Sequence, residues 1–201
     1  MSYSATETTM RPGPQRPQSF GTVTQPATGR IDVTEIGARS GYRQLEITLT
    51  NVPVTITQAT TAGFGSVNLW TFVTGSLVVA NAGLRIAAGG LTAAAGITNN
   101  NSSIVVSLGT AATADATLSS TEATIIASTA VATLASSTTG AATAAAFNAL
   151  TVVNGMSAAP VLVLNFGIGS GVSSNSSLTV SGKVTVYFSI AEVNTSDGVD
   201  Y

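Results

Sequence analysis

The sequence contains neither cysteine nor histidine. Thiolates and imidazoles are the commonest enzymatic nucleophiles and general bases, and they are also the commonest ligands of zinc and copper. An acidic repeat of the kind that binds calcium is also missing, as is a phosphate-binding glycine loop with its lysine. We therefore predict a protein that is not an enzyme and that carries no metal and no cofactor.

Charge is scarce as well. Only 8% of the residues are charged, against about 25% in ordinary soluble domains, and the mean hydropathy is +0.40. The most apolar stretches, residues 77–98 and 123–135, are interrupted by Arg85 and glycines or diluted by Thr and Ser. Neither provides about 20 uninterrupted apolar residues. We therefore expect no membrane span, and a surface that partner proteins cover instead.

Two further classes are disfavoured by the same composition. A net charge of −2 gives no reason to expect binding to nucleic acid. The first residues show neither a basic nor an apolar segment, so no secretory signal is expected. Arg85 is the one cation between residues 44 and 182, and we predict an ion pair or an inter-subunit contact for it.

The clearest local pattern is a long strand at residues 178–190. Its apolar side chains occupy even positions and its polar ones odd positions, which is typical of a strand with one buried face. Gly182 interrupts the pattern and predicts a bulge or a close backbone contact. The even set comprises Leu178, Val180, Val184, Val186, Phe188 and Ile190.

Similar patterns recur along the chain and predict seven to ten short strands. They lie at residues 44–56, 65–73, 77–79 after a turn at 74–76, 151–153 and 160–166, separated by turns rich in Gly, Asn, Ser and Thr. Pro53 predicts a turn, a bulge or an edge, and residues 60–65 predict a loop. Ser119 with Glu122 predicts a capping box that opens a short helical turn through Ile126. The fold class is therefore all-β, an antiparallel β-sandwich of the jelly-roll type. The strand order is not readable.

The Ala- and Thr-rich segment 127–146 fits neither helical nor strand periodicity. Ala favours helix and Thr favours strand, so its structure stays open at this point. A tight inter-subunit contact and an exposed loop are both compatible with its small residues.

Three regions are expected from composition. Residues 1–40 form an extended arm with several prolines, residues 41–192 the β-sandwich body, and residues 193–201 an acidic tail. The arm is either a disordered terminus or a segment that orders on a partner.

The densest charge of the chain lies at residues 30–43, with three arginines and two carboxylates. Asp32 and Glu35 are the only close carboxylate pair before the tail. Acid–base chemistry would require such a pair to lie in an enclosed cleft, so an ion-paired interface is favoured. The predicted partner-contact residues are Arg11, Arg16, Arg30, Asp32, Glu35, Arg39 and Arg43.

Several segments resemble, in order, small structural proteins encoded among the capsid genes of tailed bacteriophages. The segments are residues 65–72, 75–80, 106–110, 115–122, 125–129 and 162–166, followed by the final strand. The likeness covers roughly residues 45–190. Some members are similar to head decoration, or cement, proteins with a β-sandwich or jelly-roll body.

The resemblance implies a virion protein that binds the outer surface of an assembled head and stabilises it by bridging capsid subunits. The implied partners are the major capsid protein and further copies of the chain, as a homotrimer. The implied location is the capsid surface, after synthesis in the host cytoplasm. The family supplies no catalytic residues.

The alternative is a receptor-binding or fibre module that recognises a host glycan. Such a module needs exposed aromatic side chains to stack on sugar rings. Aromatic residues make up 5% of the chain, and most of them fall inside predicted strands, which argues against this alternative.

Overall fold

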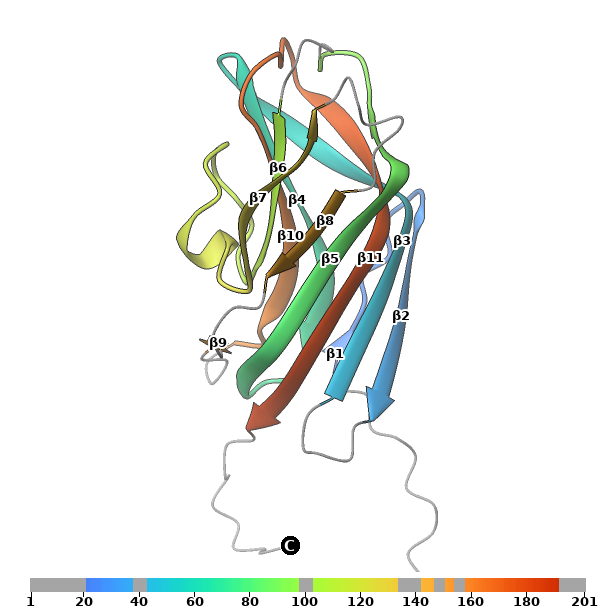
Figure 1. Ribbon diagram of the computed structural model, residues 1–201, viewed down its shortest axis with the longest axis vertical. Helices are drawn as coiled ribbons and strands as arrows, with labels where there is room; N and C mark the ends of the chain where they lie inside the picture. Colours follow the sequence, from blue (N-terminus) through green and yellow to red (C-terminus); the bar gives the residue numbers. More distant parts are fainter. Residues whose placement is uncertain are drawn as a thin grey trace, which may run out of the picture.

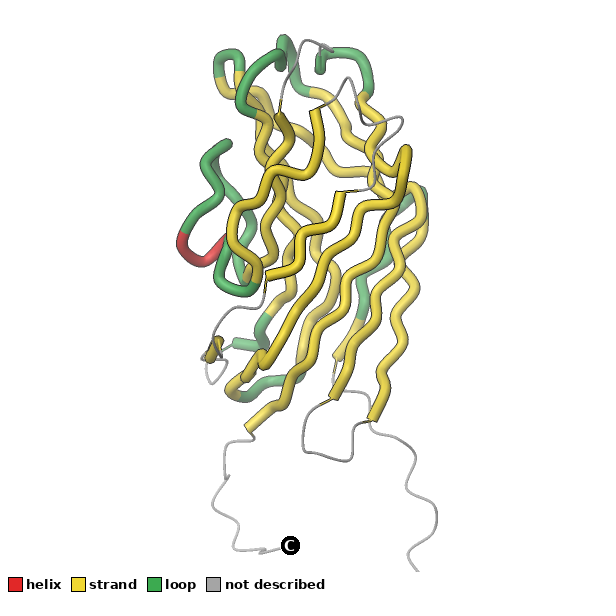
Figure 2. Tube along the Cα trace, viewed as in Figure 1, coloured by secondary structure: helices red, strands yellow, loops and turns green. Residues whose placement is uncertain are grey.

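The computed structural model describes residues 21–37, 43–97, 103–133, 142–146, 151–153 and 158–191. Figures 1 and 2 show that strands dominate this part of the chain and that its only helical element is a single 3₁₀ turn, Ser120–Glu122. The all-β prediction is therefore confirmed. The strands are β1 (Gly21–Thr22), β2 (Arg30–Gly37), β3 (Arg43–Ala59), β4 (Ala62–Phe72), β5 (Ser76–Ala93), β6 (Ser103–Gly109), β7 (Ile126–Thr133), β8 (Ala142–Ala146), β9 (Thr151–Val153), β10 (Val161–Ile168) and β11 (Ser176–Ala191).

The strands form two packed sheets that are joined at one edge, where the end of β3 pairs with β4, and every paired neighbour is antiparallel. Sheet A has the order β7-β6-β10-β4, with β1 beside β4, and sheet B has the order β2-β3-β11-β5-β8, with β9 also beside β5. Apart from the short β9, the pairing from β3 onward is nested: β3 pairs with β11, β4 with β10, β5 with β8, and β6 with β7. First-with-last nesting across two sheets is the jelly-roll arrangement, as predicted.

The core lies between the two sheets and follows the predicted alternation. The inward residues of β11, from Leu178 to Phe188, are fully buried, and each contributes about 2 kcal/mol through its removal from water. Phe188 of sheet B meets Phe72 of sheet A edge to face, with ring centroids 5.0 Å apart. This contact joins the two inner faces directly.

Both irregularities predicted within strands are present. The register of β11 shifts between Val180 and Gly182 against both of its neighbours. Pro53 lies inside β3 opposite Thr179, beyond the stretch of β3 that pairs with β2. A proline is tolerated there because this stretch of β3 has β11 as its partner on one side and no β2 partner on the other.

Two local expectations need correction. The predicted loop at 60–65 is only a two-residue turn, because Ala59 already pairs with Ala62 and β4 begins there. The helical turn is confined to Ser120–Glu122, since the Ile125 N–H donates to the Leu108 carbonyl and β7 starts at Ile126. Ser119 does cap the turn as expected, and its N–H donates to Glu122 Oε2 at 3.3 Å.

The sheets also begin earlier than the expected boundary at residue 40. β2 pairs with β3 along its whole length, and β1 pairs with β4. The physical reason is that Ile31 and Val33 have a core face to fill, and Ile31 is 1% exposed. Residues 1–20, 38–42 and 192–201 lie outside the described part, as does most of the expected arm and tail.

Part of the Ala/Thr-rich segment turns out to be strand. β7 pairs with β6 and β8 pairs with β5, so tertiary pairing supplies the order that the sequence pattern lacks. Residues 134–141 are not described.

Candidate functional site

The one close carboxylate pair is divided by sheet B. Asp32 is opposite Thr48 on the outer face, whereas Glu35 is opposite Leu45, which is fully buried in the core. Residues three apart in a strand point to opposite faces, so these two carboxylates cannot share a proton or flank one substrate.

The two described carboxylates that lie outside sheet B both accept hydrogen bonds within a single loop. Residues 110–125 join β6 to β7, and there Glu122 accepts hydrogen bonds from the Ala114 and Ser119 N–H groups. Asp115 accepts one from the Thr117 N–H at 2.6 Å. Within the described ranges, no group of three or more Asp, Glu, His or Cys side chains could hold a metal ion.

The predicted partner-contact residues do not form one cluster. Arg30 and Asp32 form an exposed ion pair of 2.6 Å on the outer face of sheet B. Arg43 pairs with Gly37 at the other end of the β2–β3 ladder, seven residues or roughly 23 Å away along β3. Arg11, Arg16 and Arg39 lie outside the described residues.

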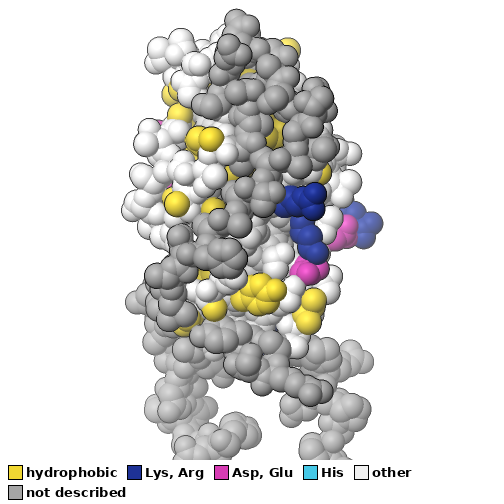
Figure 3. Space-filling view, viewed as in Figure 1, with side chains coloured by type: hydrophobic (Ala, Val, Ile, Leu, Met, Phe, Trp, Pro, Cys, Tyr) yellow, Lys and Arg dark blue, Asp and Glu magenta, His cyan; other side chains and the backbone are white. Residues whose placement is uncertain are grey.

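The outer face of sheet B instead brings together charges that are far apart in the sequence. Arg85 of β5 and Lys183 of β11 are direct cross-strand partners. Together with Arg30 they place three of the four described cations on this face, where basic side chains gather in Figure 3. Sequence reasoning missed this pair, because only the pairing of β5 with β11 joins residues 98 positions apart.

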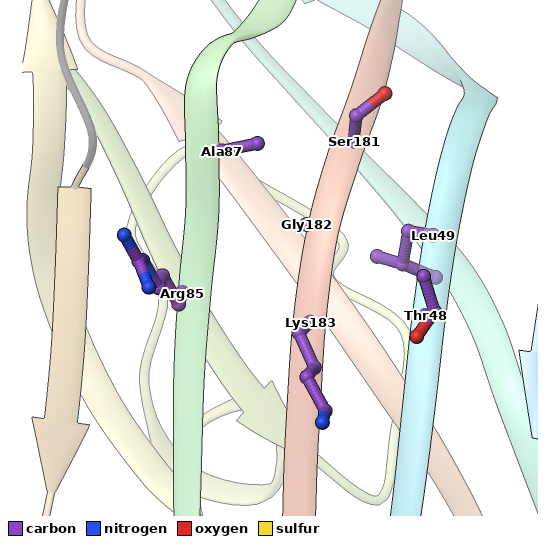
Figure 4. Close-up of a pocket in the computed structure, with 7 residues that line it drawn as sticks. All are labelled: Thr48, Leu49, Arg85, Ala87, Ser181, Gly182 and Lys183. Atoms are coloured by element: carbon purple, nitrogen blue, oxygen red, sulfur yellow. The ribbon is translucent and has the colours of Figure 1, made fainter. Parts of the chain in front are cut away.

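A groove lies beside this pair, where both neighbours of β11 lose register. From Val180 to Gly182, β11 advances by two residues, while the stretch of β3 that pairs with it, from Val52 to Leu49, advances by three. On the other side of β11, the same two residues of advance correspond to five residues of β5, from Leu91 to Ile86. The resulting groove has a volume of about 340 Å³ and is lined by Thr48, Leu49, Arg85, Ala87, Ser181, Gly182 and Lys183 (Figure 4).

The β3 side of the groove is fixed by a side-chain hydrogen bond. The Asn51 N–H donates to Ser181 Oγ at 2.9 Å, and Asn51 itself has a positive φ of 51°. Asn tolerates this backbone region better than most residues. The bulge is therefore a built feature of the sheet.

The groove carries a net positive charge. Lys183 Nζ lies 2.7 Å from Glu46 Oε2, so its charge is balanced. Arg85 is exposed and forms no ion pair with any residue that the structure describes. Like charges directly opposite each other do not stabilise a sheet, so Arg85 adds positive charge here without a stabilising ion pair among the described residues.

A second surface feature is the lower end of the body in Figure 1, which we call the terminal end. Gly21, at the start of β1, pairs with Phe72, and Ala191, at the end of β11, pairs with Ser76, four residues after Phe72. The first and the last described strands of the chain therefore both reach this end of the body. The exposed large hydrophobic side chains gather here too: Ile36 (43%) and Tyr187 (38%) flank Gln44, and Val73 (38%) lies in the adjoining turn.

No family model, curated protein or solved structure matches the chain. None of the described helical residues forms a helix long and apolar enough to cross a membrane. Function is therefore argued from the residues and their arrangement.

Proposed function

We propose that the protein is a virion structural protein that binds the outer surface of an assembled bacteriophage head and bridges its capsid subunits, as decoration or cement proteins do. The observation that carries the proposal is the arrangement of residues at the terminal end. There, both ends of the described chain meet the exposed hydrophobic side chains of the body.

The terminal end has the composition of an interface centre. Aromatic and aliphatic side chains are enriched in the buried core of protein interfaces, and Tyr is among the commonest hot-spot residues. Ile36 and Tyr187 lie on either side of Gln44. Residues 1–20, which include Arg11 and Arg16, join the body at this end, so arm and body would contact the same partner.

The mechanism is mass action. A protein that binds the assembled shell but not the free subunits stabilises the shell by its binding free energy, repeated over many sites. A homotrimer is part of the proposal, because a chain with only 8% charged residues favours association. No chemistry is required of the protein.

The first experiment is to measure the copy number of the chain relative to the major capsid protein in purified particles, by quantitative mass spectrometry. A number of the same order as that of the shell protein is expected for a decoration protein. A few copies per particle would favour the fibre or receptor-binding alternative, which the exposed Tyr187 also suits. Absence from particles would exclude both.

Two variants test the terminal end itself. Removing residues 1–20 is expected to leave the body folded, since β1 and β2 are kept, and to weaken binding to heads. Tyr187→Ser is expected to weaken binding by about thirtyfold or more, as for an interface hot spot. Thr185→Ser, one row away on the same face of β11, is the matched control and should bind normally. Equal binding by all of these proteins would remove the terminal end from the mechanism.

A further inference from the structure

We infer that the groove at the double bulge of sheet B is a recognition site for a carboxylate, presented by an acidic side chain of a protein partner. The inference deepens the proposed function, on which it rests for the nature of the partner. The site lies on the outer face of sheet B, away from the exposed hydrophobic side chains of the terminal end, and nothing in the sequence pattern assigned it.

The first argument is electrostatic. Arg85 and Lys183 are cross-strand partners on one face, and only Lys183 has a balancing carboxylate, that of Glu46 at 2.7 Å. A carboxylate bound here would form charge-assisted hydrogen bonds with Arg85, the cation of the pair that lacks a carboxylate partner among the described residues, while Lys183 keeps Glu46. Arg85 suits this role because its planar guanidinium matches the two oxygens of a carboxylate.

The second argument is the shape of the site. Figure 4 shows the Arg85 side chain directed away from β11 and the Lys183 side chain directed along β11 away from Gly182, which adds no side chain of its own, so the surface over Gly182 is left clear. The groove volume of about 340 Å³ falls within the range of ligand sites, roughly 300–1,000 Å³. Thr48 adds a hydroxyl to the lining, and Leu49 and Ala87 add apolar surface. An acidic side chain with its aliphatic stem fits this combination of a cationic rim and an apolar wall.

The third argument distinguishes an acidic peptide from an acidic sugar. Sugar sites use aromatic side chains for stacking, and none of the residues that line the groove is aromatic. Arg85, Ala87 and Lys183 of the groove lining are exposed, so a polypeptide segment has access to them. We therefore assign the partner group as an Asp or Glu side chain.

The test is a two-dimensional amide NMR titration of the full chain with a capped pentapeptide that has one glutamate among alanines. Its glutamine analogue and N-acetylneuraminic acid serve as comparison probes. Saturable shifts are expected at the groove residues, with a dissociation constant on the order of 1 mM for so small a probe. The glutamine analogue should bind at least about tenfold more weakly, since a charged hydrogen bond is lost.

Variants separate a built site from general attraction to positive charge. Arg85→Gln is expected to weaken peptide binding by about tenfold, and Arg85→Lys by less, because charge is kept while the planar fork is lost. Arg30→Gln, on the same face but already paired with Asp32, is the control and should leave binding unchanged.

Several results would overturn the inference: equal shifts with the glutamine analogue, no shifts at the groove, or equal losses for Arg85→Gln and Arg30→Gln. Tighter binding of N-acetylneuraminic acid than of the peptide would assign the groove to a sugar instead. Because the titration uses the isolated protein, its failure leaves the copy-number test of the proposed function untouched. Likewise, a failure of the copy-number test leaves the result of the titration untouched.

Discussion

The outer faces of the two sheets differ, although both belong to one sandwich with a shared core. In sheet A, residues 162–168 of β10 are buried on both faces, because loop 110–125 covers the outer side. The outer face of sheet B is open and carries Arg30, Arg85 and Lys183. The chain thus covers one sheet with its own loop and leaves the other accessible to partners.

The cover of sheet A is held by a few polar side chains of the sheet: Asn165, with Ser66 and Ser107. Asn165 is 0% exposed and points outward from β10. Its Oδ1 accepts from Ser66 Oγ at 2.6 Å and from the Thr113 N–H at 3.0 Å, and its Nδ2 donates to the Ala111 and Glu122 carbonyls. Every hydrogen-bonding group of this amide has a partner, so its burial does not incur the free-energy cost of an unsatisfied polar group.

The largest effect is expected from Asn165→Leu, which removes three of the hydrogen bonds between sheet A and its cover. The Ala111 carbonyl would lose its hydrogen bond from Asn165, whereas the Thr113 N–H keeps Ser66 Oγ at 2.9 Å and the Glu122 carbonyl keeps Ser107 Oγ at 2.7 Å. We expect a loss of about 2–4 kcal/mol in the free energy of unfolding, measured by urea denaturation. Hydrogen exchange should rise in loop 110–125 and stay unchanged in sheet B.

The control for this variant is Asn68→Leu, at an exposed position on neighbouring β4. It should change stability by less than about 0.5 kcal/mol. If Asn165→Leu were equally harmless, the loop would be held by something other than this network, and the contrast between the sheets would need another cause.

The next effect concerns the double bulge of sheet B. A Cβ at residue 182 would lie 2.5 Å from the Arg85 carbonyl oxygen and 3.1 Å from Ile86 Cα, and both are backbone atoms. Gly182→Ala is therefore expected to cost about 1–3 kcal/mol in unfolding free energy and to alter the groove.

Gly83→Ala provides the matched comparison, because Gly83 lies in the same strand as Arg85 and no atom lies within 4 Å of its Cβ position. This change should be neutral or stabilise by up to about 1 kcal/mol. Thermal denaturation of the two variants side by side measures the difference. A harmless Gly182→Ala would show that the strands at the bulge can separate freely.

A smaller effect is expected at the free edge of sheet B. The Gln25 side-chain amide donates to the Ile31 carbonyl at 2.5 Å and accepts from the Ile31 N–H at 3.0 Å. These two backbone groups of β2 point away from β3, and Gln25 satisfies both of them. Exposed strand edges promote pairing between chains. Gln25→Ala should therefore lower stability by about 1 kcal/mol and increase association at high concentration, as measured by light scattering.

Gln44→Ala is the control here, since the Gln44 side chain donates to Glu46 and not to the edge of β2. An unchanged oligomeric state in both variants would mean that the edge is protected without Gln25.

The smallest effect is expected from Arg85→Thr, which relieves the repulsion between Arg85 and Lys183. We expect stability to stay constant or to rise by up to about 0.5 kcal/mol at low salt, with the gain disappearing at high salt as charges are screened. Arg30→Thr loses an exposed ion pair and should cost between zero and about 1 kcal/mol. A clear loss of stability in Arg85→Thr would mean that Arg85 has a structural role.

The residue pattern predicted individual strands well wherever large apolar side chains alternate with polar ones. The strand predicted at 178–190 is observed as Ser176–Ala191, and the strand predicted at 160–166 as Val161–Ile168. The pattern predicted only the start of β5, at 77–79, because its later part is rich in Ala and Gly and gives little periodic contrast. Strand structure there depends on pairing with β11 and β8.

The candidate site was predictable only in part. The charged stretch at residues 30–43 is conspicuous in the sequence, yet the sheet separates its members by face and by length. The pair formed by Arg85 and Lys183 gave no local signal. Its two strands are neighbours through a non-local contact, which no sequence window contains.

The sequence by itself determined that the protein is all-β, which residues face the core along its clearest strands, and that histidine and cysteine chemistry is excluded. These properties depend on side-chain type and on the two-residue period of a strand, both of which are local. Tertiary structure decided the nested strand order, the cover over sheet A, and the meeting of two cations beside a groove on sheet B. Those features arise from pairings between distant segments, whose selection depends on how the whole core packs.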